Sequence, residues 1–194
     1  MNYLVHLYLS DPTPECLLGT LMGDFVKGRI GESFAPGVRR GIVLHRKVDV
    51  FAESHPAFRS SKGRICDSYG YFRGILVDIF YDHFMARNWE RYGSEPLPEF
   101  ARRVYAVLEN HAGSLPAPMK STASAMIAHN WLVSYREMDV IGRVLERVSS
   151  RLRRPNPLGL GLAELEKNYA GLEDDFRAFL PEAQDFVRCF PHEG

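Results

Sequence analysis

The chain has 194 residues, of which 45% are hydrophobic, 12% aromatic and 25% charged, a balance typical of a folded globular domain. Its 24 basic and 24 acidic residues cancel, which excludes binding to nucleic acid or an anionic membrane through overall charge alone. Its three cysteines stand far apart with no CxxC pair, which argues against a disulfide framework or a zinc knuckle and favours a reducing compartment.

The N-terminal stretch MNYLVHLYLSDPTP is apolar, but it lacks the basic start and the small-residue cleavage site of a signal peptide. No apolar run approaches the roughly 20 residues that a membrane-spanning helix needs. We therefore expect a cytoplasmic protein with neither a nucleic-acid nor a membrane partner. The sequence makes no prediction of the oligomeric state.

Helical spacing of apolar residues dominates the chain. Proline at the start and glycine just past the end delimit a first helix over residues 14–28. Further helices are predicted, in chain order, over residues 36–54, 55–67, 71–92, 98–113, 118–131, 131–152 and 161–180, with a bend near Asn130 and a last short helix that starts at Pro181. Strand signals are nearly absent. We therefore predict an all-α fold, with residues 1–194 forming a single compact helical domain.

The segment LVDIFYDHFMARNW (76–89) places charged groups within an apolar helix. Asp78 and Asp82 are four residues apart, so their Cβ atoms lie about 5–6 Å apart on one face. Like charges at this distance repel unless a cation lies between them or one carboxyl is protonated. His83 is turned by about 100° and could join such a site only at its edge. The alternative is an exposed acidic face.

His45 and Asp49 form a second pair at helical spacing. The carboxylate could orient the imidazole, as the partners of metal-bound histidines do, or the pair could be a surface contact. Asp24 lies near the C-terminus of a predicted helix, where a carboxylate needs a compensating cation. His6, alone among apolar residues, is typical of a hydrogen-bonded core histidine. Together these oxygen and nitrogen groups suit Mn²⁺, Fe²⁺ or Mg²⁺ better than a structural zinc ion.

Basic residues gather in two places, and arginine is well suited to binding phosphate and carboxylate groups. The first group surrounds His45 and consists of Arg39, Arg40, Arg46 and Lys47. The second group lies on one face of a predicted helix and consists of Arg143, Arg147 and Arg151. Solvated helix faces are the alternative for both groups.

Five motifs in order, MNYLVHLYLS, GTLMGDFVKG, GIVLHRKVDVF, DIFYDHFMARNW and WLVSYREMDVIGRVLERVSSR, resemble the acyl carrier protein phosphodiesterases. The resemblance covers residues 1 to about 180. It implies a hydrolase of fatty acid metabolism that removes the 4′-phosphopantetheine arm from holo-acyl carrier protein and leaves the apo form. It also implies a divalent cofactor, with Mn²⁺ favoured over Mg²⁺ or Fe²⁺, and a fold like that of the HD phosphohydrolases.

The resemblance further implies a set of site residues. Standard HD enzymes carry an adjacent His-Asp pair, whereas this chain has His45-Arg46 and the reversed Asp82-His83. The implied metal ligands are Asp24, His45, Asp78 and Asp82. Asp49 and His83 are expected to orient ligands or transfer protons, and the resemblance gives no role to His6.

The implied reaction is attack of water on the phosphodiester, with the seryl oxygen as the leaving group. Arg46 or Lys47 would hold the phosphate. The acidic carrier protein would dock on arginines, with Arg143, Arg147 and Arg151 as the first candidates and Arg39 and Arg40 as the others. The alternatives are an HD-type phosphohydrolase that acts on a nucleotide or small phosphodiester, and a helical module that binds the carrier protein without cleaving it.

Overall fold

A computed structural model describes residues 3–190, and within them it contains helices and no strand. The α-helices are α1 (Tyr3–Tyr8), α2 (Pro14–Met22), α3 (Pro36–Ser54), α4 (Pro56–Arg64), α5 (Arg73–Arg87), α6 (Leu97–Asn110), α7 (Ala117–Ala128), α8 (Trp131–Ser134), α9 (Met138–Arg151) and α10 (Leu162–Arg188). Short 3₁₀ helices cover Asp67–Phe72, Trp89–Arg91 and Leu158–Leu160. The all-α prediction is confirmed.

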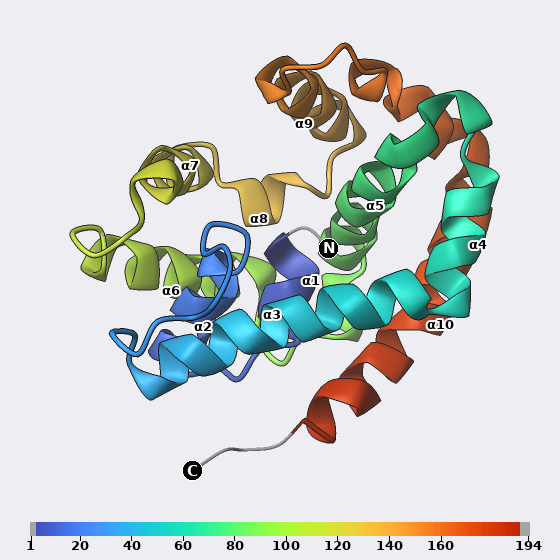
Figure 1. The fold of residues 1–194 in the computed structure, drawn as a ribbon. Helices are drawn as coiled ribbons and strands as arrows, with labels where there is room; N and C mark the ends of the chain where they lie inside the picture. Colours follow the sequence, from blue (N-terminus) through green and yellow to red (C-terminus); the bar gives the residue numbers. More distant parts are fainter. Residues whose placement is uncertain (1–2, 191–194) are drawn as a thin grey trace.

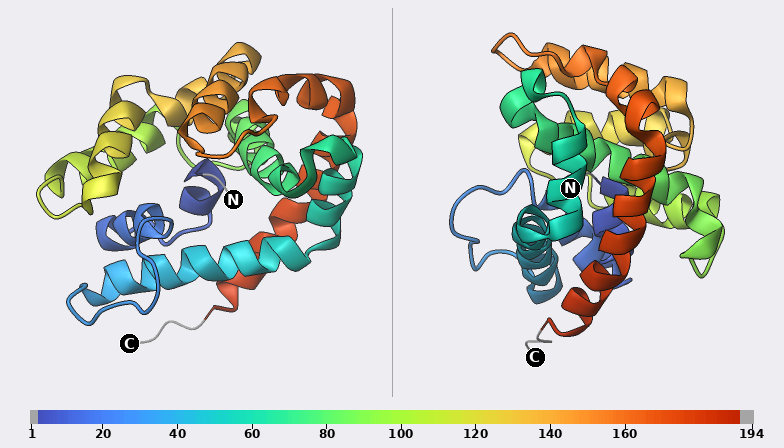
Figure 2. Two further views of the ribbon diagram at one scale, coloured as in Figure 1. Left: turned by 45° about the horizontal axis from the view of Figure 1, so that its top comes forward. Right: turned by 90° about the vertical axis from the view of Figure 1, so that its right-hand side faces the viewer.

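The apolar faces of the helices share one connected core (Figure 1). Helix α5 contributes an almost continuous buried surface, from Leu76 to Ala86. Helices α4 and α10 flank α5 on one side, α9 covers its N-terminal half, and α6 and α7 extend to the other side (Figures 1 and 2). The short helix α1 lies inside this frame, between α3 and α5. Three helices that are distant in sequence are thus brought together near His6.

Helices α2 and α3 approach each other closely because glycine lies at their contact. A Cβ atom on Gly19 would lie 2.1 Å from the Val38 carbonyl oxygen, and one on Gly41 would lie 2.2 Å from the Cys16 carbonyl oxygen. Any side chain at these positions would separate the helices. This packing fixes the end of α2, where Asp24 follows, against the middle of α3, where His45 lies.

A buried carboxylate joins α10 to α4. Asp175 accepts hydrogen bonds from the hydroxyls of Ser60 and Ser61 and from two nitrogens of Arg64, the shortest at 2.7 Å. Because the charge is paired and hydrogen-bonded, its burial is tolerated. The Ser61 hydroxyl also contacts the Tyr81 hydroxyl, which ties both helices to α5.

Most of the predicted helices are present, but several boundaries differ. The helix predicted over residues 14–28 ends at Met22, and the helix predicted over residues 131–152 is divided into α8 and α9. Helix α1 has no counterpart among the predictions. Asn130 adopts a left-handed conformation (φ 46°) between α7 and α8, which confirms the predicted bend. The helix expected over residues 71–92 is restricted to Arg73–Arg87. The prediction that Pro181 starts a new helix is wrong, because α10 runs through this proline. Proline removes one helical hydrogen bond, but burial of Phe179, Leu180 and Ala183 around it keeps the helix continuous.

Within residues 3–190, no helix combines the length and the apolar character that crossing a membrane requires.

Candidate metal centre

His6, His45 and Asp49 bring three potential metal ligands together from α1 and α3. One ligand atom of each lies within 4.8 Å of the others. The Nε2 atom of His6 lies 3.0 Å from Oδ1 of Asp49, and the Nε2 atom of His45 lies 3.4 Å from Oδ2 of the same carboxylate. The two imidazole rings are stacked at 3.8 Å between centroids. Both histidines are buried, so their nitrogens are shielded from bulk solvent.

Asp24 adds a second carboxylate beside His45. Its Oδ1 atom lies 3.5 Å from His45 Nε2. The residue before it makes this approach possible, because a Cβ atom on Gly23 would lie 2.2 Å from the His45 ring. The turn after α2 therefore packs directly on the imidazole. Arg46 holds the following segment in place by donating hydrogen bonds to the carbonyl oxygens of Val26 and Gly28.

A cavity of about 290 Å³ opens beside this cluster. Asp24 and Asp49 line it on one side, and Asp78 lines it from α5. The remaining wall includes Val148 of α9 and Phe58 of α4. With Glu53, four carboxylate residues thus line one space, whose size would admit a phosphoryl group and water but not a large cofactor.

The pKa values of these groups reflect burial and mutual contact. Burial lowers the pKa of His6 to about 3, and the charge of His45 adds to this effect. Burial also acts to lower the pKa of His45, but its contacts with Asp24 and Asp49 outweigh it and raise the pKa. Burial raises the pKa of Asp78 to about 6, with a contribution from the charge of Asp49. The site therefore stabilises positive charge at the point where His45 meets the two carboxylates.

The residues present fit a divalent cation. His45 Nε2 is buried and makes no well-aligned hydrogen bond, although two carboxylates lie near it. Two ligands at right angles on a cation with bonds of about 2.1 Å are roughly 3.0 Å apart. The His6–Asp49 and His45–Asp49 separations of 3.0 and 3.4 Å are close to this value. The donors are imidazole and carboxylate, which suit Mn²⁺ and Fe²⁺.

The resemblance implies that Asp82 is a metal ligand, but in the structure its carboxylate binds the backbone of α1. Its Oδ2 and Oδ1 atoms accept hydrogen bonds from the backbone N–H groups of Leu4 and Val5, at 2.8 and 2.9 Å. Helix α1 has its positive end here, so a carboxylate from α5 satisfies its first donors. We therefore leave Asp82 out of the ligand set and consider it a cap that holds α1, and with it His6, in position.

The structure does not bring His83 to the cavity. Its Nδ1 atom lies 2.8 Å from the carbonyl oxygen of Tyr135, and its Nε2 atom lies 3.0 Å from the Tyr169 hydroxyl. Because a carbonyl oxygen only accepts, Nδ1 donates and Nε2 accepts from the tyrosine. The fully buried ring thus links α5 to α8 and α10.

Comparison with known proteins gives a consistent result. A family model described as acyl carrier protein phosphodiesterase matches residues 1–183. The chain belongs to this family. Similar relatives named acyl carrier protein phosphodiesterase occur in Serratia proteamaculans, at 33% identity over 94% of this chain and 95% of the relative, and in Escherichia coli O157:H7, at 33% identity over 93% and 94%. A relative of the same name in Photorhabdus laumondii is 31% identical over 98% of this chain and 100% of its own. No solved structure gives a significant match.

Some of the basic residues predicted to bind phosphate or the carrier protein are paired with carboxylates, and others are exposed. Arg40 pairs with Asp11 at 2.6 Å, whereas Arg39 and Lys47 are exposed. On α9, Arg143 pairs with Asp139 at 2.6 Å, Arg147 lies over the Trp131 ring, and Arg151 is exposed. Val148, on the same helix, lines the cavity. Helix α9, which carries this arginine group, therefore contributes to the cavity wall.

Sequence reasoning gave no metal-binding role to two residues of the candidate site. His6 is a ligand candidate in the structure, and the only signal for it was a polar residue in the apolar run NYLVHLYL. Gly23 was not singled out, although its position directly before Asp24 is where the backbone must approach His45. In both cases the decisive contact joins helices that are distant in sequence.

Proposed function

We propose that this chain hydrolyses the phosphodiester that links 4′-phosphopantetheine to the carrier serine of holo-acyl carrier protein. Membership of the acyl carrier protein phosphodiesterase family supports the proposal. The cluster of His6, His45 and Asp49 beside a cavity lined by carboxylates is the structural observation that carries it.

The proposed cofactor is one divalent cation held by His6, His45 and Asp49, with Asp24 as a further oxygen donor. Mn²⁺ is our first choice, and Mg²⁺ and Fe²⁺ are the alternatives, because all three accept oxygen and nitrogen donors. When bound, such a cation neutralises charge on a phosphoryl oxygen and lowers the pKa of water beside it.

The polar residues in and near the cavity have separate tasks in this proposal. Asp49 contacts both imidazoles, so it orients them and is not available to move protons. Asp78 lies in the cavity wall on α5, and its carboxylate accepts the proton of the attacking water. Arg46 positions the segment after Asp24 through its backbone hydrogen bonds, and Lys47 is the cation that remains exposed to reach the phosphate.

The carrier protein is proposed to dock on α9. Arg147 and Arg151 have no carboxylate partner among residues 3–190, and Val148 between them lines the cavity. Acidic carrier proteins would be steered to this face, which would place the prosthetic arm next to the carboxylates. Arg40 is less suited to the task because Asp11 already neutralises it.

The test is incubation with holo-carrier protein and Mn²⁺, followed by intact-mass measurement. The expected result is loss of the phosphopantetheine mass from the carrier protein. Asp49→Asn should abolish this loss, and the exposed control Asp174→Asn should retain it. A second incubation with bis(p-nitrophenyl) phosphate and nucleotides separates the alternatives. Hydrolysis of nucleotides with an unchanged carrier protein would overturn the assignment, and binding without cleavage would identify a binding module.

A further inference from the structure

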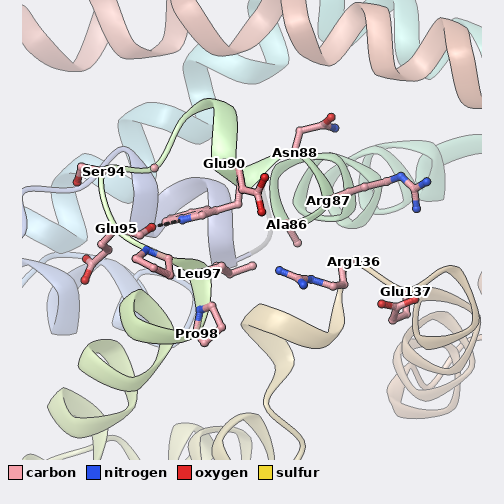
Figure 3. A pocket seen from close by; sticks show the side chains of 13 residues that line it. Ala86, Arg87, Asn88, Glu90, Ser94, Glu95, Leu97, Pro98, Arg136 and Glu137 are labelled. Carbon is pink, nitrogen blue, oxygen red and sulfur yellow. Dashed lines mark hydrogen bonds between the residues drawn. The ribbon is translucent and has the colours of Figure 1, made fainter.

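A second cavity of about 740 Å³ lies at the opposite end of α5 (Figure 3). It is formed by the C-terminal end of α5, the turn at residues 93–96, the first turn of α6 and residues 136–137. Asp78 and Arg87 are nine residues apart, which corresponds to about 13 Å along the helix axis. No residue lines both this cavity and the one beside the metal centre. The size falls within the range of small-molecule sites.

Arg136 is the distinctive residue of this cavity. Its Nε atom is buried and has no hydrogen-bond partner. Among residues 3–190 its guanidinium also forms no ion pair with a carboxylate. Figure 3 shows the side chain pointing toward Ala86 and Leu97, whereas Glu137 points away from them. Arg136 as a whole is half-buried, but its buried Nε–H donor lacks an acceptor, which is unfavourable. The position therefore suits an acceptor from outside the chain.

Two carboxylates near Arg136 are engaged with other arginines. Asp139, one turn further along the chain, pairs with Arg143 at 2.6 Å. Glu95, in the wall of the cavity, pairs with Arg103 at 2.6 Å. These pairs take Asp139 and Glu95 away from Arg136. Glu90 and Glu137, the other carboxylates of the wall, form no ion pair with Arg136 in the described structure.

The rest of the wall is rigid and partly apolar. Trp89 donates a hydrogen bond from Nε1 to the Glu95 carbonyl oxygen at 2.7 Å, which holds the turn before α6. Leu97 and Pro98 begin α6, so the positive end of this helix borders the cavity. Ala86 completes an apolar surface next to the cationic group.

We propose that this cavity binds a small monocarboxylate with an apolar body. The planar guanidinium of Arg136 would hold the carboxylate through paired hydrogen bonds, and Leu97, Pro98 and Ala86 would contact the apolar part. Glu90 and Glu137 also line the cavity, and their charge disfavours ligands with two negative charges, such as phosphate monoesters. The site is independent of the hydrolytic reaction.

Titration of ¹⁵N-labelled protein with sodium hexanoate tests the proposal by NMR. The indole N–H signal of Trp89 reports on the cavity, and that of Trp131, beside Arg147, serves as an internal reference. We expect a saturable shift of the Trp89 signal and none at Trp131. Hexan-1-ol, which has the same apolar body and no charge, should cause no saturable shift.

Substitutions separate a specific site from general association. Arg136→Gln should weaken hexanoate binding at least about tenfold, the size of one charge-assisted hydrogen bond. The exposed control Arg102→Gln, on α6, should bind hexanoate as the unmodified protein does. Retained signal dispersion in Arg136→Gln shows that the variant is folded. Equal binding by Arg136→Gln, equal shifts with hexan-1-ol, or tighter binding of butyl phosphate than of hexanoate would overturn the proposal.

Discussion

The position of the His45 ring depends on the absence of a side chain at Gly23. Because a Cβ atom there would overlap the ring, Gly23→Ala should push the imidazole away from Asp24 and Asp49. We expect the affinity for Mn²⁺ to fall by at least about tenfold, since one of the ligands is displaced. Isothermal titration with MnCl₂ measures the effect.

Gly63 provides the matched control for this substitution. It lies in α4, and nothing lies within 4 Å of a Cβ atom built on it. Gly63→Ala should leave Mn²⁺ affinity unchanged and raise the free energy of unfolding by roughly 0.5–1 kcal/mol, as expected for alanine in a helix. An unchanged affinity in Gly23→Ala would show that the ring position is not set by this contact.

The buried His83 ring should make the free energy of unfolding depend on pH. Burial lowers its pKa, although the hydrogen bond to the Tyr135 carbonyl acts in the other direction. The folded protein therefore binds fewer protons at this group than the unfolded chain, where a histidine pKa is about 6.5. The stability that the neutral ring provides is present above that value, and it is lost as the pH falls below it through the folded pKa.

Urea unfolding at pH 7.5 and pH 5.5 checks this expectation. His83→Gln, which can still donate to Tyr135, should lose less stability between the two pH values than the unmodified protein. The exposed control His129→Gln should behave as the unmodified protein. An identical pH dependence in His83→Gln would assign the effect to other groups.

Helix α1 illustrates how one element depends on another. Its six residues are too few for a helix that is stable alone, and its first N–H groups are satisfied by Asp82 of α5. Asp82→Ala should lower the free energy of unfolding by roughly 2–4 kcal/mol, because two buried donors lose their acceptor. Hydrogen exchange at Leu4 and Val5 should accelerate, and Mn²⁺ affinity should fall because α1 carries His6.

Asp185→Ala is the control for the cap, since Asp185 is exposed on α10 and contacts only Arg188 in the described structure. It should change stability by less than about 0.5 kcal/mol. If Asp82→Ala were equally mild, the carboxylate would not be what holds α1.

The helices could be predicted from local signals, but their ends and contacts could be predicted only in part. Prolines 14, 36 and 56 each begin a helix as expected, because proline suits the first turn. Pro181 has the same local signal but lies inside α10, where burial outweighs the lost hydrogen bond. The partners of Asp82 lie 77 and 78 residues away, and the Tyr169 partner of His83 lies 86 residues away, so no local pattern could reveal them.

Across the whole molecule, the candidate site combines predicted and unpredicted residues. Spacing or the family resemblance points to Asp24, His45, Asp49 and Asp78. The structure brings the three carboxylates to one cavity and places His45 against two of them. His6 could not be assigned from sequence because its partner, Asp49, lies 43 residues away. The periodicity of apolar residues shows on which face of its own helix a side chain lies. It does not show which other helix packs against that face.

The net charge of the molecule does not describe the charge of its individual surfaces. The chain is neutral overall, yet α9, which contributes Val148 to the cavity wall, carries a group of arginines. Reversing the charge of Arg147 and Arg151 to Glu should raise KM for holo-carrier protein by about tenfold at low salt, because steering and docking are lost. The value of kcat, and hydrolysis of bis(p-nitrophenyl) phosphate, should not change. If the carrier protein is hydrolysed with its original rate and salt dependence, docking occurs elsewhere; Arg102→Glu is the control.

The most direct measurement is anomalous X-ray diffraction from crystals of the protein soaked in Mn²⁺. We expect one strong anomalous peak within coordination distance of His6 Nε2, His45 Nε2 and the Asp49 carboxylate, and its loss in crystals of His6→Ala. A peak at other residues, or none at saturating Mn²⁺, would contradict the assignment of this cluster as the metal centre.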